Sequence, residues 1–212
     1  MATIGRRLRW WLVLGWVGSG LAVIGFALVL PAGSRPARPV PVVDWGSTEP
    51  ELAGRVSQQA RPAGPPPVGS RLRITQFGIA APIVPVTAPG GVLQVPADPG
   101  TIGWWAGGAV PGARQGSAVL AGHVNYAGTS GALAVLARIR PGAQITLAEP
   151  GVAPMRYSIR AVRSYPKASG IPASVFSRAG PARLILITCG GPFDPVSGNY
   201  LDNLVGYAYP IT

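Results

Sequence analysis

The sequence predicts a mainly β domain preceded by one transmembrane helix. Two observations predict this fold class. From residue 71 onward, short apolar runs are punctuated by Gly and Pro, and several alternate apolar with polar residues as half-buried strands do. Before them, residues 10–30 form a stretch of 21 residues that carries no charge. A β domain held at a membrane surface is therefore the expected architecture.

The charge-free stretch 10–30 is long enough to cross a bilayer as a helix. At roughly 1.5 Å per residue it spans about 31 Å, which matches the thickness of a hydrocarbon core. Two tryptophans begin it, where an interfacial aromatic belt lies. A cleaved signal peptide is an alternative, because the small-residue sequence PAGSRPA follows. A buried soluble helix is disfavoured because no face of the stretch is polar.

The charges beside this stretch predict its orientation. Arg6, Arg7 and Arg9 precede it and favour a cytoplasmic segment 1–9, because positive residues stay on the cytoplasmic side. Arg35 and Arg38 weaken this bias without reversing it. The protein is therefore expected in the cell membrane as a single-pass protein, with everything after residue 30 extracellular.

Residues 31–69 are predicted to form an extracellular stalk. The chain holds 30 Gly and 24 Pro, which is high for a globular protein, and this segment contains the runs PAGSRPARPVP and RPAGPPPVGS. Proline at this density blocks helices and sheet ladders and favours an extended, semi-rigid backbone. We expect the stalk to hold the folded domain away from the membrane.

Residues 70–212 are expected to form that domain, a β-barrel or sandwich of seven or eight short strands. Only two short segments, 130–139 and 172–178, have helical patterns. In the first, Ser130 is expected to cap a helix whose Leu133, Leu136 and Ile139 share one face. The expected strands lie within 71–86, 91–97, 116–124, 142–148, 155–165, 182–189 and 203–212.

The net charge limits the classes of partner. The chain carries 18 Lys and Arg against 7 Asp and Glu, a formal charge of +11. A positive field attracts polyanions, but an exported domain rarely meets nucleic acid. Anionic envelope polymers or lipid head groups suit the expected location, and an ordinary solubilising surface is the alternative.

Cys189 and His123 are the candidates for chemistry, and each is the single residue of its type in the chain. Cys189 ends the apolar run LILITC just before two glycines, and His123 follows the apolar run SAVLA and one glycine. Both runs therefore deliver one reactive side chain at the end of a buried strand. A thiolate is the nucleophilic form of cysteine, and a nearby imidazole favours it. A buried inert thiol and a structural histidine are the alternative interpretation of each residue alone.

Two other site classes are disfavoured. One His and one Cys supply at most two soft metal ligands, and no spacing motif adds more, so no metal site is expected. The segment GGPFD lacks the Gly-x-x-x-x-Gly-Lys pattern of a phosphate loop.

The order of these features resembles the sortase family, the cysteine transpeptidases of Gram-positive surfaces. The resemblance covers about residues 71–212 and is carried by GWWAGGAVPGARQGSAVLAGHV, LILITCGG and YLDNLVGYA. The local sequence around PG…GSAVLAGHV and LITCGGPFD most resembles the actinobacterial class F sortases. The amino-acid composition suits a GC-rich actinobacterium. The resemblance implies an eight-stranded sortase β-barrel with short helices.

The resemblance also implies a reaction. Cys189 takes the place of the family's nucleophile, and His123 that of its catalytic histidine, which exchanges a proton with the reacting amine. The implied substrates are surface proteins that end in a Leu-Pro-x-Thr-Gly-like sorting signal. The cysteine forms an acyl-thioester, and an amine on a cell-wall precursor then accepts the acyl group. No cofactor is implied, because the thioester conserves the acyl activation.

One family feature is missing. Sortases usually carry an arginine on the strand after the cysteine, but residues 190–212 contain no Arg or Lys. Asn203 stands near that position, and an amide can donate hydrogen bonds to an oxyanion. Alternatively, an arginine from another strand reaches the site, and the candidates are Arg183, Arg156 and Arg160.

The remaining alternative is a catalytically weak or inactive sortase-fold module that binds the cell envelope. An L,D-transpeptidase is a further enzymatic alternative, but its Ser-His-Gly-Cys run is absent. The long connection 164–182 precedes the cysteine strand, and in sortases this loop covers the groove for the sorting signal.

Overall fold

The computed structural model describes residues 44–48, 66 and 68–211. The predicted transmembrane helix 10–30, the segment 1–9 and most of the predicted stalk lie outside the described residues. Within the described ranges, no helix is long and apolar enough to cross a membrane. All described residues belong to one compact unit that spans Pro39–Thr212.

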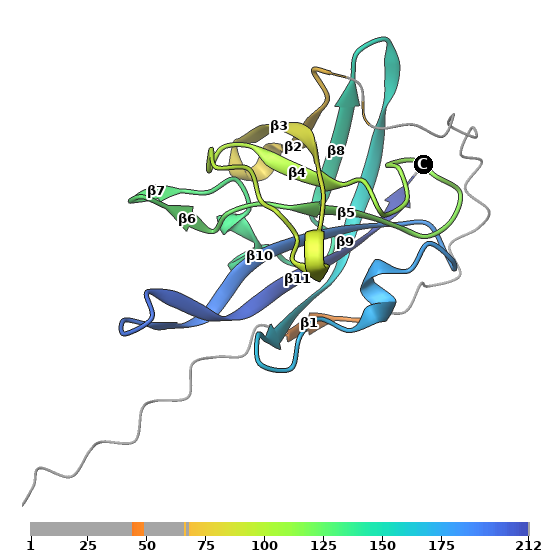
Figure 1. The fold of residues 1–212 in the computed structure, drawn as a ribbon. Helices are drawn as coiled ribbons and strands as arrows, with labels where there is room; N and C mark the ends of the chain where they lie inside the picture. Colours follow the sequence, from red (N-terminus) through yellow and green to blue (C-terminus); the bar gives the residue numbers. More distant parts are fainter. Residues whose placement is uncertain (1–43, 49–65, 67, 212) are drawn as a thin grey trace, which may run out of the picture. The chain divides into compact units, whose positions relative to one another are not determined.

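The regular secondary structure of the described part consists of strands and short 3₁₀ helices, as Figure 1 shows. The strands are β1 (Asp44–Gly46), β2 (Arg71–Ile74), β3 (Ile79–Val86), β4 (Ile102–Trp105), β5 (Ser117–Ala121), β6 (Asn125–Tyr126), β7 (Thr129–Ser130), β8 (Gln144–Glu149), β9 (Val152–Pro166), β10 (Arg183–Asp194) and β11 (Asn199–Ile211). The 3₁₀ helices are η1 (Thr75–Phe77), η2 (Pro89–Gly91), η3 (Ala134–Ala137) and η4 (Ala173–Phe176).

Eight of these strands close into a barrel. Their order is β9-β11-β10-β5-β4-β3-β2-β8, and a further pairing of β8 with β9 closes the ring. Most neighbours are antiparallel, but β5 and β10 run parallel, as do β3 and β4. The predicted mainly β class and the eight-stranded barrel are confirmed.

Several local predictions are wrong. The strand predicted at 91–97 is an irregular connection, because it begins in the turn at Gly90 and Gly91 and contains Pro96. The predicted helix 130–139 shortens to the 3₁₀ turn η3, since residues 129 and 130 belong to the small β6–β7 hairpin. Ser130 therefore caps no helix, and η3 has no side-chain cap.

The apolar residues separate into two clusters on the two faces of the sheet. The inner cluster fills the barrel and includes Leu120, Leu133, Leu136, Ile139 and Leu186. Each fully buried Leu or Ile contributes roughly 1.5–3 kcal/mol to folding. The predicted apolar face of Leu133, Leu136 and Ile139 is thus confirmed as a core face, although the helix is only one turn.

The outer cluster lies on the opposite face of β5, β10, β11 and β9. Its buried members are Val119, Ala121, Ala161, Val175, Ile185, Ile187, Val205, Tyr207 and Tyr209. Ile171 and Phe176, from the connection between β9 and β10, pack over it. Trp105 joins the cover through an edge-to-face contact with Phe176, with ring centroids 5.5 Å apart.

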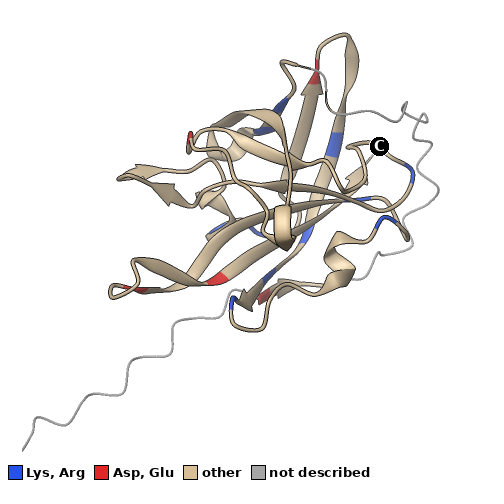
Figure 2. Cartoon of the chain, in the orientation of Figure 1, with Lys and Arg blue, Asp and Glu red and all other residues tan. Residues whose placement is uncertain are grey.

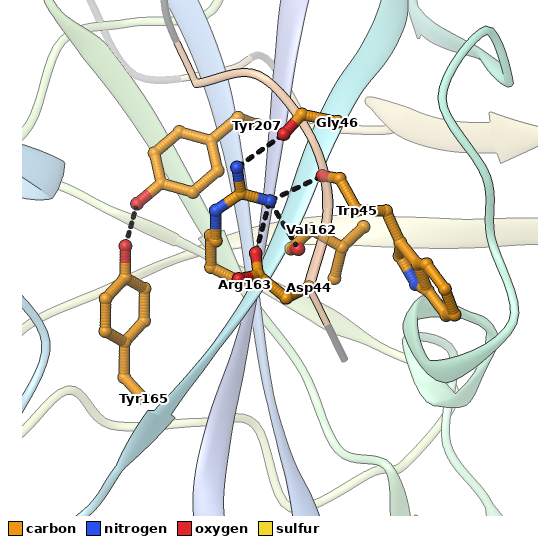
Figure 3. A network of polar contacts seen from close by, with 7 residues as sticks. All are labelled: Asp44, Trp45, Gly46, Val162, Arg163, Tyr165 and Tyr207. Atoms are coloured by element: carbon orange, nitrogen blue, oxygen red, sulfur yellow. Dashed lines mark hydrogen bonds and ion pairs between the residues drawn. The ribbon is translucent and has the colours of Figure 1, made fainter. Parts of the chain in front are cut away.

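The strand β1 lies within the segment predicted as stalk, and it adds to the free edge of β9. Figure 3 shows the contact that fixes it. The guanidinium of Arg163 forms an ion pair with Asp44 (2.6 Å) and donates to the carbonyl of Trp45 (2.6 Å) and to that of Gly46. Asp44 is more than half exposed, so the ion pair itself adds little, and the two carbonyl bonds specify the docking. The boundary between stalk and domain at residue 69 stays a prediction.

Candidate active site

Cys189 lies near the point where β10 leaves the barrel. Ile185 and Ile187 of the same strand belong to the outer cluster, so the alternation of a strand places Cys189 on the outer face as well. The thiol is partly exposed and forms no disulfide. The register of β10 against β11 shifts between Gly190 and Phe193. Beyond this β-bulge, the two strands continue as a hairpin that projects beyond the barrel (Figure 1). The thiol is thus accessible at the end of an apolar surface.

The parallel pairing of β5 with β10 brings His123 to the same place. The pairing runs from Ser117 opposite Arg183 to Ala121 opposite Ile187, and Gly122 N donates to Ile187 O at 3.1 Å. His123 and Cys189 each follow the last pair by two residues. Neighbouring strands lie about 4.8 Å apart, so the two residues occupy adjacent positions at one edge of the sheet.

The two side chains also share a face. A Cβ placed on Gly122 would contact Leu133 and Ile102 of the inner cluster at 3.2 and 3.5 Å. The chain therefore still alternates at Gly122, and His123 points to the outer face like Cys189. The parallel register is thus consistent with the pairing that the repeated strand-end pattern predicts, and the pairing stays a prediction.

The imidazole of His123 is held by two contacts. Its Nε2 lies 3.0 Å from the carbonyl oxygen of Pro96, and its ring stacks on Tyr126 with centroids 4.9 Å apart. A carbonyl oxygen only accepts hydrogen bonds, so Nε2 carries a hydrogen. Nδ1 is then the ring nitrogen available for chemistry.

The loop that supplies the Pro96 carbonyl is fixed by Asp98. The Asp98 carboxylate accepts hydrogen bonds from the Thr101 hydroxyl (2.5 Å) and from Gly100 N (3.1 Å). These bonds, the Thr101 bond first, lower the pKa of Asp98 below its ordinary value. The carboxylate therefore stays ionised at neutral pH, and its support of the loop is lost only when the pH falls through that lowered pKa.

A glycine permits the close approach of the backbone behind His123. A Cβ on Gly131 would lie 2.0 Å from the carbonyl oxygen of His123, so no larger residue fits without moving the histidine. The same carbonyl accepts a hydrogen bond from Leu133 N at 3.3 Å. The β6–β7 hairpin and the turn η3 thus fix the main chain of His123.

Asn203 lies directly opposite Cys189. The two are Cα partners in the β10–β11 ladder, and Asn203 is in turn the partner of Tyr165 on β9. Opposite residues of an antiparallel pair project from the same face with Cβ atoms about 5 Å apart. Cys189, Asn203 and Tyr165 therefore form one row across three strands, which we call the cysteine row.

The three arginines considered from sequence lie elsewhere. Arg183 is six residues before Cys189 on β10, roughly 20 Å along the strand, and its Nε donates to the Ser117 hydroxyl at 2.8 Å. Arg160 and Arg156 lie five and nine residues before Tyr165 on β9, roughly 17 and 30 Å from the cysteine row. Figure 2 shows acidic but no basic segments on the projecting end of the β10–β11 hairpin, because residues 190–212 contain no Lys or Arg. Asn203 is the sequence candidate that the register places beside the thiol.

Sequence analysis missed three residues that shape this site. Pro96 and Tyr126 hold the imidazole, and Tyr165 completes the cysteine row. The residue types alone gave no signal for Pro96, because its role is played by a main-chain carbonyl. Tyr165 ends the alternating pattern of 155–165, and its face could have been deduced from that pattern once the partner strand was known.

Thr188 offers a test of how the strand beneath the thiol is packed. It is 3% exposed, it faces inward opposite Leu204, and its hydroxyl has no hydrogen-bond partner among the described residues. Burying such a hydroxyl costs about 1–3 kcal/mol. We expect Thr188→Val, which keeps the shape, to raise the free energy of unfolding by about 1 kcal/mol in urea titrations. A loss of stability would show that the hydroxyl has a partner.

Comparison with known proteins identifies the family. A family model described as the Sortase domain matches residues 72–211. The chain belongs to the sortase family. No curated protein sequence matches it.

Solved sortase structures share the fold at low sequence identity. Sortase C-1 from Actinomyces oris is 16% identical, with 74% of this chain and 92% of that chain covered and a TM-score of 0.53. Sortase A from Corynebacterium diphtheriae is 18% identical, with 82% and 76% covered and a TM-score of 0.53. Sortase C1 from Streptococcus agalactiae is 16% identical, with 68% of each chain covered and a TM-score of 0.54.

Membership of the sortase family indicates the general class of enzyme. Sortases are cysteine transpeptidases that act on proteins bearing a sorting signal, and the barrel of this chain is the sortase barrel. The likeness to these solved structures supports the fold.

Proposed function

We propose that this sortase is an active transpeptidase in which Cys189 is the nucleophile and His123 the proton donor and acceptor. The observation that carries the proposal is the parallel register of β5 and β10, from which we infer that the two residues lie near each other at one end of these strands. The sulfur is partly exposed, and the imidazole beside it is oriented by Pro96 and Tyr126. An imidazole near a thiol supports the assignment of a nucleophile and its base.

The proposed reaction exchanges one amide for another through a thioester. The Cys189 thiolate attacks the Thr carbonyl carbon of a Leu-Pro-x-Thr-Gly-like signal, and His123 gives a proton to the departing glycine amine as the C–N bond breaks. An acceptor amine on a cell-wall precursor then attacks the thioester and loses a proton to His123. A new amide forms, and the Cys189 thiolate is regenerated.

Asn203 is proposed to stabilise the oxyanion that forms in both steps. Its side chain lies opposite Cys189 in the cysteine row, and an amide nitrogen donates hydrogen bonds. It lacks the charge and the two-pronged geometry of arginine, so the stabilisation is weaker than an arginine would give.

The cellular setting is part of the same proposal. The charge-free stretch 10–30 and the arginines before it support a single-pass membrane anchor with the barrel outside the cell. There, the enzyme would attach surface proteins to the cell wall. The motifs around His123 and Cys189 support a place among actinobacterial class F sortases.

A transfer assay tests the proposed activity. The full-length protein is incubated with Leu-Pro-x-Thr-Gly-type peptides and an excess of an amine acceptor such as triglycine, and products are separated by mass. We expect a joined product whose yield rises with acceptor concentration and which Cys189→Ala abolishes. The alternative is an inactive envelope-binding module, which predicts no joined product at any acceptor concentration.

A further inference from the structure

Two tyrosine hydroxyls meet inside the largely apolar outer cluster. The hydroxyl oxygens of Tyr165 and Tyr207 lie 2.7 Å apart, and Figure 3 shows the two rings converging on this contact. Tyr207 is 4% exposed and lies in the outer cluster with Ile187 and Val205. A buried polar group costs free energy unless it is hydrogen-bonded, so the pair requires an explanation beyond packing.

The direction of the bond follows from burial. Tyr207 is the buried partner, so its hydrogen has to be used within the protein, and Tyr165 is its one hydroxyl partner among the described residues. Burial first, and the bond to Tyr165 second, raise the pKa of Tyr207 far above its ordinary value, so the phenol stays neutral. Tyr207 thus donates and Tyr165 accepts.

This leaves the hydrogen of the Tyr165 hydroxyl for another acceptor. Tyr165 is only partly buried, and among the described residues its hydroxyl has no second partner. Arg163 and Arg183 both lie near enough to Tyr207 to oppose the rise of its pKa. The guanidinium of Arg163 pairs with Asp44, and that of Arg183 donates to Ser117. Their positive charges still favour a hydrogen-bond acceptor beside the Tyr165 hydroxyl.

The position of the pair relative to Cys189 fixes which part of a substrate could reach it. Tyr165 lies two strands from Cys189, roughly 10 Å away in the cysteine row. Its hydroxyl leans toward Tyr207, which lies four residues beyond Asn203 on β11. An extended peptide advances about 3.3 Å per residue, so two or three residues separate the scissile bond from this hydroxyl.

We propose that Tyr165, oriented by Tyr207, donates a hydrogen bond to a main-chain carbonyl of the acyl-donor peptide, two or three residues before the scissile bond. This subsite rests on the proposed function. It supplies one polar anchor on an apolar surface, which sets the register of the peptide so that the correct carbonyl faces Cys189.

Binding measured without turnover tests the subsite. In full-length Cys189→Ala protein, the Kd of a Leu-Pro-x-Thr-Gly-type peptide is compared with that in Cys189→Ala/Tyr165→Phe. We expect the second change to weaken binding about tenfold, because one buried hydrogen bond is lost. Tyr200→Phe is the matched control, since the Tyr200 hydroxyl contacts Asn125 instead, and it should leave the Kd unchanged.

A modified peptide locates the acceptor. Replacing the amide two or three residues before the scissile bond by a thioamide, a weaker acceptor, should weaken binding to Cys189→Ala protein and leave binding to the Cys189→Ala/Tyr165→Phe protein unchanged. Equal Kd values with and without Tyr165→Phe, or thioamide losses that persist in full without the hydroxyl, would overturn the subsite. Turnover by the unmutated protein is measured separately, so a failed subsite and a failed transpeptidase give different results.

Discussion

Replacing His123 by Gln is expected to lower kcat/KM for acyl transfer by roughly 10²- to 10⁴-fold. The amine that leaves the substrate is a very poor leaving group without a proton, and His123 is the single imidazole in the chain. Gln keeps a hydrogen-bond donor for the Pro96 carbonyl but cannot exchange a proton near neutral pH. The loss should appear in steady-state rates.

The control for this change is Tyr126→Phe. It keeps the ring that stacks on His123 and removes only the hydroxyl, so kcat/KM should stay within about twofold of the original. If His123→Gln retained a third or more of the activity, the imidazole would have no role in proton transfer, and the pairing of β5 with β10 would be structural only.

Replacing Asn203 by Ala is expected to reduce kcat by about 10²-fold, because one oxyanion donor is removed. KM should change little, since the interaction forms in the transition state. Asn203→Arg should recover activity, because the sortase resemblance places an arginine near this position and the guanidinium donates more hydrogen bonds. Alkylation of Cys189 passes through no oxyanion, so its rate should not fall in either variant.

Asn199→Ala is the matched control for Asn203. Asn199 lies four residues earlier on β11 and donates to Ser197 O at the hairpin tip, outside the cysteine row. It should leave kcat within about twofold. An Asn203→Ala enzyme with unchanged kcat would mean that another group faces the oxyanion, and Arg163 would then be the nearest arginine to examine.

The strands that carry the chemistry could be predicted because their pattern is local. The buried runs before His123 and Cys189 became β5 and β10; β5 ends before Gly122, whereas β10 continues through both glycines to Asp194. The pairing of these two strands could not be deduced from local pattern, because 66 residues separate His123 from Cys189. The family resemblance predicted that His123 and Cys189 act together, and the parallel register of β5 and β10 is the structural basis for that prediction.

The failed predictions have particular physical causes. Residues 92–96 alternate like a strand, but proline and glycine on both sides leave them without a ladder partner. The strand β1 looked like part of a proline-rich stalk, because the contact that docks it comes from Arg163, more than 100 residues away. Asn203 could be proposed from sequence, whereas Tyr165 and Tyr207 required the register across three strands.

The mass of the trapped intermediate shows directly whether Cys189 carries the acyl group. Full-length protein is mixed with excess Leu-Pro-x-Thr-Gly-type peptide without an acceptor amine, quenched in acid, digested and mapped. The account predicts that the peptide containing Cys189 gains the mass of the acyl fragment that ends in Thr, and that hydroxylamine removes it. Product release by Cys189→Ala protein, or an acyl group on any other residue, would contradict the account.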